Sequence, residues 1–130
     1  MRHKEKIKYW IDLADYDFET AKVMLLSNRF LYVGFMCHQC IEKALKALYV
    51  KTKLEAPPKI HSLSILIRKI GLENDLSDLF IELVDKLDPL NIEARYPTYK
   101  DELFKSLTKD YCQIVFDQTS ELLKWIKTKL

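Results

Sequence analysis

Hydrophobic residues between Phe30 and Thr52 recur at steps of three and four positions, which is the spacing of one face of a helix. The pattern predicts a long helix over residues 30–52 with one buried face and one polar face. We expect the other helices of the chain to pack around it. The apolar face consists of Leu31, Cys37, Cys40, Ile41, Ala44, Leu45 and Leu48.

The opposite face of this helix carries a dense set of polar groups. At about 100° per residue, five polar side chains fall within an arc of roughly 140°. One interpretation is a solvated face with charge pairs four residues apart. The other is a face that lines a cleft for an anionic ligand or for a second copy of the protein. The five residues are His38, Gln39, Glu42, Lys43 and Lys46.

A second amphipathic stripe predicts a helix over about residues 5–27. Asp17 lies near the middle of this stripe, where an unpaired carboxylate would cost several kcal/mol. We therefore expect Asp17 to meet a cation or a donor, with Lys43 and His38 as candidates, or to lie at a wet edge of the stripe. The polar break at residues 27–29 predicts an antiparallel return into the central helix.

Shorter helices are predicted after Pro57 and Pro58, which cannot continue the central helix. The first of them is expected to be capped by Ser62 or a neighbour and stopped by Gly71. The next is expected to run from a cap at residue 74 or 75 to Pro89, because apolar residues again recur at helical spacing. His61 stands at the entrance of the first short helix, a place more typical of a cap or surface residue than of a catalyst.

The last helix is expected to begin near Tyr99, after a capping box at residues 98–101, and to run almost to Leu130. Arg95 would then stand just outside a helix N-terminus, where exposed N–H groups and the helix dipole favour anions. The planar fork of an arginine can hold a phosphate with two hydrogen bonds. Alternatively, the acidic residues of the first helical turn could pair with Arg95 internally.

The composition fits one helical domain that spans residues 1–130. Only two glycines occur in 130 residues, too few for the many turns of a β-sandwich. We expect an all-α fold, an up-and-down bundle of four or five helices. No glycine-rich loop is present, so a nucleotide site would have to be built from side chains. No stretch has the length of a membrane span, and no signal peptide precedes the first helix, which together predict a cytoplasmic protein.

The three cysteines suggest neither a metal site nor a redox centre. Cys37 and Cys40 enclose His38, but both lie on the apolar face in the middle of a helix, and no second pair completes a tetrahedral site. Their expected role is core packing. An odd number of cysteines also fits reduced thiols in the cytoplasm. We expect no metal and no cofactor.

The formal net charge of +2 hides a segregation along the chain. Residues 41–71 carry seven basic and two acidic side chains, whereas residues 72–93 carry one basic and seven acidic side chains. One surface could attract phosphates while another repels them. Ordinary solvated helix faces that differ in sign are an equally good explanation.

Several segments, taken in order, resemble the HEPN domain family, the nucleotide-binding domains of higher eukaryotes and prokaryotes. The likeness covers nearly the whole chain. Its strongest part is the central helix, where residues 35–48 run close to the pattern F-x-C-x-Q-x-x-E-K-x-L-K-A-L. The other matching segments are Trp10-x-x-x-Ala14-x-x-Asp17-x-x-x-Ala21, Pro58-x-x-His61-x-Leu63-x-x-Leu66 and Glu93-Ala94-Arg95-Tyr96-Pro97.

This resemblance implies a helical bundle that pairs through a two-fold interface into a homodimer. Some members are metal-independent RNases or RNase-like toxins, others bind nucleotides, and many are encoded beside a small nucleotidyltransferase that neutralises or modifies them. The nuclease members use an Arg-x(4–6)-His motif to activate a ribose 2′-OH. Arg95 matches the arginine, but no histidine stands four to six residues after it. Nuclease activity is therefore uncertain, because general acid–base catalysis is typically worth about 10²–10⁴-fold.

Three hypotheses follow. The first is a binding module that holds a nucleotide or an RNA phosphate, with Tyr96 stacking on a base. The second is an altered RNase in which His38 or His61 reaches Arg95. The third is a dimer that binds a protein partner such as a nucleotidyltransferase and has no catalytic role. The candidate ligand-binding residues are Asp17, His38, Glu42, Lys43, Lys46, Arg95 and Tyr96.

Overall fold

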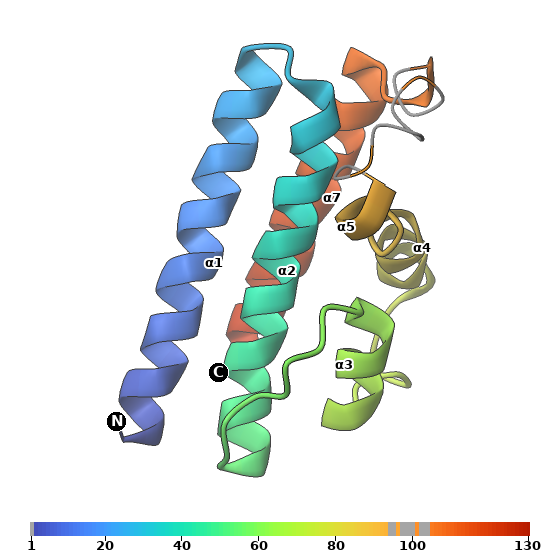
Figure 1. The fold of residues 1–130 in the computed structure, drawn as a ribbon. Coiled ribbons are helices and arrows are strands. Elements are labelled where there is room, and N and C mark those ends of the chain that lie inside the picture. Colours follow the sequence, from blue (N-terminus) through green and yellow to red (C-terminus); the bar gives the residue numbers. More distant parts are fainter. Residues whose placement is uncertain (1, 94–95, 97–100, 102–104) are drawn as a thin grey trace.

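The computed structural model describes residues 2–93, 96, 101 and 105–130, and every regular element in these ranges is a helix (Figure 1). Helix α1 (His3–Leu26) and helix α2 (Phe30–Lys53) form a long antiparallel hairpin. Helix α7 (Lys109–Thr128) packs along α2 and also contacts α1. The prediction of an all-α fold organised around the central helix is confirmed.

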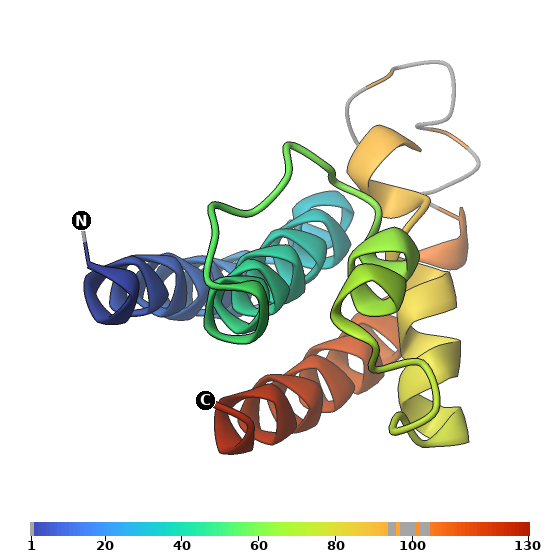
Figure 2. The same cartoon turned by 90° about the horizontal axis from the view of Figure 1, so that it is seen from below.

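The shorter helices lie on the side of α2 that faces away from α1 (Figures 1 and 2). They are α3 (Leu63–Ile70), α4 (Asp78–Leu87) and the single turn α5 (Leu90–Glu93). Both α3 and α4 contact α2, and α4 also contacts α7. Helix α2 is therefore in contact with the long helices α1 and α7, and short elements cover the side that faces away from α1.

The predicted ends of helix α3 are confirmed. The Ser62 hydroxyl accepts a hydrogen bond from the backbone N–H of Ile65 at 3.3 Å. Gly71 ends the helix with φ of +85°, a left-handed conformation that glycine adopts without a steric cost. The capped start of α3 therefore follows directly after His61 in the chain.

One predicted helix start is wrong. Helix α4 begins at Asp78 and is capped by Ser77, whose hydroxyl accepts a hydrogen bond from the backbone N–H of Phe80 at 3.2 Å. Residues 74 and 75 do not cap it because they lie in a turn before the helix, in which the N–H of Asp75 bonds to the carbonyl of Leu72. The start that was expected near Tyr99 lies outside the described residues, but the continuous run to Leu130 is wrong, because residues 107 and 108 are not helical and the last long helix begins at Lys109. Thr108 has an extended backbone there, and its hydroxyl caps the new helix. Residue 98 of the expected capping box lies outside the described residues.

A turn of helix also replaces part of the loop that was expected after Pro89. This turn, α5, brings Leu90 directly against Gly34 of α2. A Cβ atom at position 34 would clash with the Leu90 side chain, so the absence of a side chain permits the close approach. The expectation that Gly34 admits a neighbour is confirmed. Within the described residues, no helix is both long enough and apolar enough to span a bilayer.

Candidate functional site

The polar face of α2 is largely buried. The fractional exposure is 0% for His38, 3% for Glu42 and 5% for Lys46. These residues are spaced four apart and form one row along the helix. The interpretation of this arc as a solvated face is therefore wrong for these three residues. The physical reason is that elements α3 to α5 and the segment before α3 pack over this face.

Glu42 is the centre of this row. Lys46 Nζ donates a hydrogen bond to Glu42 Oε2 at 3.1 Å, and His61 Nδ1 lies 3.2 Å from each carboxylate oxygen. The Nδ1 atom of His38 is 3.9 Å from Glu42 Oε1. The ammonium group of Lys46 also lies 5.5 Å from the centre of the Trp10 ring, a cation–π distance. The buried charges are thus paired within one network, as burial requires.

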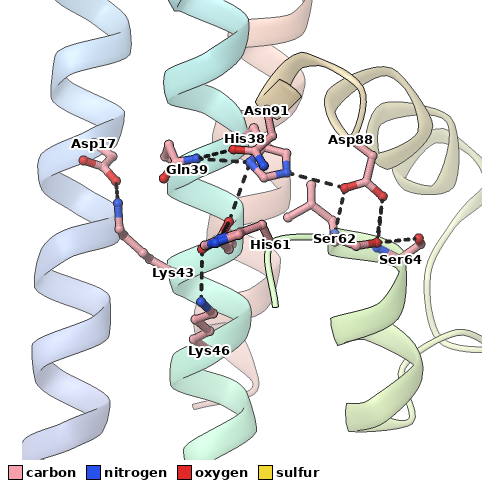
Figure 3. Close-up of polar contacts among 12 residues, drawn as sticks. Asp17, His38, Gln39, Lys43, Lys46, His61, Ser62, Ser64, Asp88 and Asn91 are labelled. Atoms are coloured by element: carbon pink, nitrogen blue, oxygen red, sulfur yellow. Dashed lines mark hydrogen bonds and ion pairs between the residues drawn. The ribbon is translucent and has the colours of Figure 1, made fainter. Parts of the chain in front are cut away.

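Asp88, at the end of α4, connects this network to α3 (Figure 3). His38 Nε2 lies 3.5 Å from Asp88 Oδ1, and the backbone N–H groups of Leu63 and Ser64 donate to the same carboxylate at 2.7 and 3.2 Å. The Ser62 hydroxyl lies 3.4 Å from Asp88 Oδ2. Burial opposes ionisation of Asp88, but these hydrogen bonds outweigh it and hold its pKa below the usual value.

A separate polar contact joins α1 to α2. Lys43 donates to Asp17, and both side chains are mostly buried (Figure 3). The expectation that Asp17 meets a cation is confirmed, and the cation is Lys43, not His38. Nearer α5, Gln39 Nε2 donates to Asn91 Oδ1 at 3.0 Å. The five residues of the predicted polar arc therefore make contacts on two different sides of α2.

A groove of about 590 Å³ opens beside the Glu42 network. This size falls in the range of small-molecule sites. Asp85 and Asp88 give the groove an acidic character, and His61 and Ser62 supply further hydrogen-bonding groups. Within the described residues, its lining contains no lysine or arginine. The lining consists of His61, Ser62, Asp85, Asp88, Pro89, Asn91 and Ile92.

The structure brings only part of the predicted site together. His38, Glu42, Lys46 and His61 belong to one network, while Lys43 forms its own pair with Asp17. Arg95 lies outside the described residues. Tyr96 is 55% exposed. Whether these residues bind a ligand stays a prediction.

Sequence reasoning missed Asp88, Ser62 and Asn91 as parts of this site. Asp88 comes 50 positions after His38, and Asn91 comes 52 positions after Gln39. Contacts over such separations depend on how the short helices pack and have no local periodic signal. The one signal in the sequence that could have pointed to Ser62 was its position next to His61 at the start of a predicted helix.

The cysteines occupy the core, as predicted. Cys37 and Cys40 are fully buried, and burial raises the pKa of Cys37 to about 12. Burial likewise raises the pKa of Cys112 to about 11. Such thiols stay protonated at neutral pH and are poor nucleophiles and poor metal ligands. Within the described residues, no group of three or more His, Cys, Asp or Glu side chains could hold a metal ion.

The architecture defines a class: a helical domain in which a central helix with a buried polar row is enclosed by a long hairpin partner and by short helices. The HEPN domain family matches residues 7–129, and the chain belongs to this family. A candidate toxin of Methanocaldococcus jannaschii, MJ1304, is 27% identical over 121 residues, which is 90% of this chain and 78% of that protein.

A solved structure has the same fold. The crystal structure of TT1696 from Thermus thermophilus matches with a TM-score of 0.80 and 22% identity, over 96% of this chain and 98% of that one. The fold is therefore shared along almost the full length of both proteins.

Proposed function

We propose that this protein is a nucleotide- or RNA-binding HEPN domain whose ligand occupies the groove beside the Glu42 network. The observation that carries the proposal is the groove itself, about 590 Å³ in size and rimmed by ionisable and hydroxyl groups at the edge of a buried charge network. Membership of the HEPN family supports the same function. Clefts that combine these features are the usual ligand sites of small domains.

Arg95 and Tyr96 are the proposed anchors for the phosphate and the base. Ile92 lines the groove, and Arg95 follows it by three positions in the sequence. A guanidinium suits phosphate, and an exposed tyrosine ring suits stacking on a base. This role for Arg95 is a proposal from the sequence.

The test is a titration of the full chain with ATP, GTP and a short single-stranded RNA at low and moderate salt. We expect binding that weakens as salt rises, because phosphate contacts are salt-sensitive. Arg95→Ala should weaken binding about tenfold or more, whereas the exposed control Arg29→Ala should leave it unchanged. Absence of binding to all three ligands would overturn the proposal.

We also propose that the protein acts as a homodimer in a toxin–antitoxin-like pair with a small nucleotidyltransferase. The similarity to a candidate toxin supports the toxin–antitoxin-like role. The homodimer is supported by exposed apolar side chains one heptad apart on α1, namely Tyr9, Tyr16 and Val23. Light scattering of the wild type and of Tyr16→Glu tests the dimer. A monomeric wild-type protein would contradict it.

An altered RNase is the second candidate, and the observation that favours it is His61, whose imidazole is held by a carboxylate at the groove. His38 is fully buried and less suited to reach a substrate. Cleavage of labelled RNA that His61→Ala abolishes would support this candidate. Cleavage that survives the change would exclude His61 as its catalyst.

A further inference from the structure

A second pocket, of about 310 Å³, lies between α3 and α4, and of its described lining residues only Asp85 also lines the groove. It forms where the chain turns from one helix into the other (Figure 2). The N–H groups of Gly71 and Leu72 both donate to the carbonyl of Ile67 at 3.0 Å, which fixes this turn. Residues of the turn therefore line the pocket together with both helices. The lining consists of Ser64, Ile67, Arg68, Glu73, Leu76, Ile81, Val84 and Asp85.

The walls of this pocket are aliphatic. Ile67 and Val84 belong to the core, with 5% and 3% of their surface exposed, whereas Ile81, which also lines the pocket, is 40% exposed. An apolar group that enters the pocket removes aliphatic surface from water, which is the main favourable contribution to binding. The volume lies at the lower end of the range of small-molecule sites, so the ligand that fits it is small.

Three charged side chains border these walls. Arg68 comes from the last turn of α3, Glu73 from the turn between the helices, and Asp85 from α4. All three are exposed, and within the described ranges the side chain of none of them forms a hydrogen bond or an ion pair. The pocket therefore combines apolar walls with one cation and two anions that have no partner among the described residues.

This distribution of charge favours one class of ligand. A ligand with a single negative charge is repelled by Glu73 and Asp85, and one with a single positive charge is repelled by Arg68. A ligand that carries both charges meets an opposite charge for each of them. A guanidinium suits a carboxylate because it can donate two parallel hydrogen bonds, and a carboxylate accepts hydrogen bonds from an ammonium group.

We propose that this pocket binds a small zwitterion with an apolar body, that is, a free amino acid with a large apolar side chain. Arg68 holds the carboxylate of the ligand, and Glu73 and Asp85 hold its ammonium group. The apolar body of the ligand lies against Ile67 and Ile81. This site is separate from the nucleotide groove and gives the domain an additional binding function.

The test compares related ligands by the shifts of isoleucine methyl signals in NMR spectra of the full chain. L-Phenylalanine carries both charges, phenethylamine lacks the carboxylate, 3-phenylpropionate lacks the ammonium group, and glycine lacks the apolar body. We expect phenylalanine to shift the signals of Ile67 and Ile81, but not that of Ile114 on α7, with a dissociation constant of about 1 mM. Loss of either charge should weaken binding about fivefold, and glycine should cause no shift.

Substitutions of the charged residues test the role of each charge. Arg68→Gln should remove the advantage of phenylalanine over phenethylamine, because a neutral amide no longer distinguishes the two ligands by charge. The double change Glu73→Gln and Asp85→Asn should likewise remove its advantage over 3-phenylpropionate. The matched controls are Lys69→Gln and Glu82→Gln, whose exposed side chains do not line the pocket. Both controls should keep the wild-type ratios of the dissociation constants.

Three results would overturn the proposal. The first is the absence of shifts at Ile67 and Ile81 with all the aromatic ligands. The second is equal binding of these ligands, since the charges would then play no part. The third is a preference for phenylalanine that survives the substitutions. Thermal unfolding of the variants should match that of the wild type, because the replaced side chains are exposed, so a lost preference cannot be ascribed to misfolding.

Discussion

Helix α2 takes part in two charged contacts that differ in their relation to solvent. Towards α1, Lys43 pairs with Asp17, and the long continuous helix α1 packs over this side of α2. Towards α3 to α5, Glu42 contacts both Lys46 and His61, and a groove opens beside them. Each contact pairs a lysine ammonium group with a carboxylate, and the two contacts differ in the elements that cover them. Short helices leave gaps between them that a long helix does not.

The two contacts also differ in what they are expected to do for the protein. The Asp17–Lys43 pair neutralises two charges that would otherwise be buried without a partner when α1 packs on α2. The Glu42 network satisfies buried charges too, but it ends in a histidine that is exposed at the groove. We therefore expect changes in the first contact to affect stability alone, and changes in the second to affect stability and binding.

The largest effect is expected for Glu42→Ala. This change removes the carboxylate and leaves the buried Lys46 ammonium without its partner, which should lower the free energy of unfolding by about 3–5 kcal/mol. Urea denaturation gives the measurement. Glu121→Ala, in an exposed ion pair with Lys124, is the control and should change the free energy of unfolding by less than about 1 kcal/mol. An equal effect of the two changes would contradict a buried network.

Asp17→Asn is expected to lower the free energy of unfolding by a smaller amount, about 1–3 kcal/mol. The change replaces the carboxylate that pairs with Lys43 by a neutral amide, which can still accept a hydrogen bond. Replacing both residues by leucine should restore stability to near the wild-type level, since apolar pairs often substitute for buried ion pairs without loss. Nucleotide titrations of the double variant should match the wild type. Loss of binding in this variant would show that the two contacts are not independent.

The pH dependence of stability tests Asp88. Its pKa is lowered in the folded state, so the ionised form stabilises the fold at pH values above the ordinary aspartate pKa of 3.8. This contribution is lost as the pH falls through the lowered folded-state value. Asp88→Asn should flatten that part of the pH profile and cost about 1 kcal/mol at pH 7, the size of a lost helix cap. An unchanged acid profile in the variant would exclude this role.

The smallest effect concerns the buried cysteines of α2 and α7. With pKa values of about 12 for Cys37 and about 11 for Cys112, these thiols should react with a thiol reagent at pH 8 only after unfolding. Absorbance after addition of the reagent, with and without denaturant, measures this. Rapid labelling of the native protein would show that the core around α2 opens readily.

Much of the fold could be predicted because it rests on periodic patterns. The hairpin of α1 and α2, the cap of α3 at Ser62 and its stop at Gly71 were all evident from spacing and residue type. The start of α7 was missed because Thr98 and Thr108 are both plausible caps in the sequence. A local signal cannot tell which of two such threonines begins the helix.

The candidate site was predictable only on its α2 side. Spacing four residues apart placed His38, Glu42 and Lys46 in one row, and the family pattern drew attention to His61. No pattern in the local sequence indicated that this row is buried or that Asp88 contacts His38 at its end. Burial of a polar residue depends on which elements cover it, and a single helix pattern does not contain that information.

By itself, the sequence determined the helical class, the central place of α2, the opposite chemistry of its two faces and the family to which the chain belongs. Helical periodicity and capping are local properties of neighbouring residues, and they survive any arrangement of the helices. The tertiary structure alone decided that Lys43 turns to Asp17, that Glu42 meets His61 and Lys46, and that a groove remains between short helices. These features arise from contacts between distant segments, whose geometry is fixed only when the core packs.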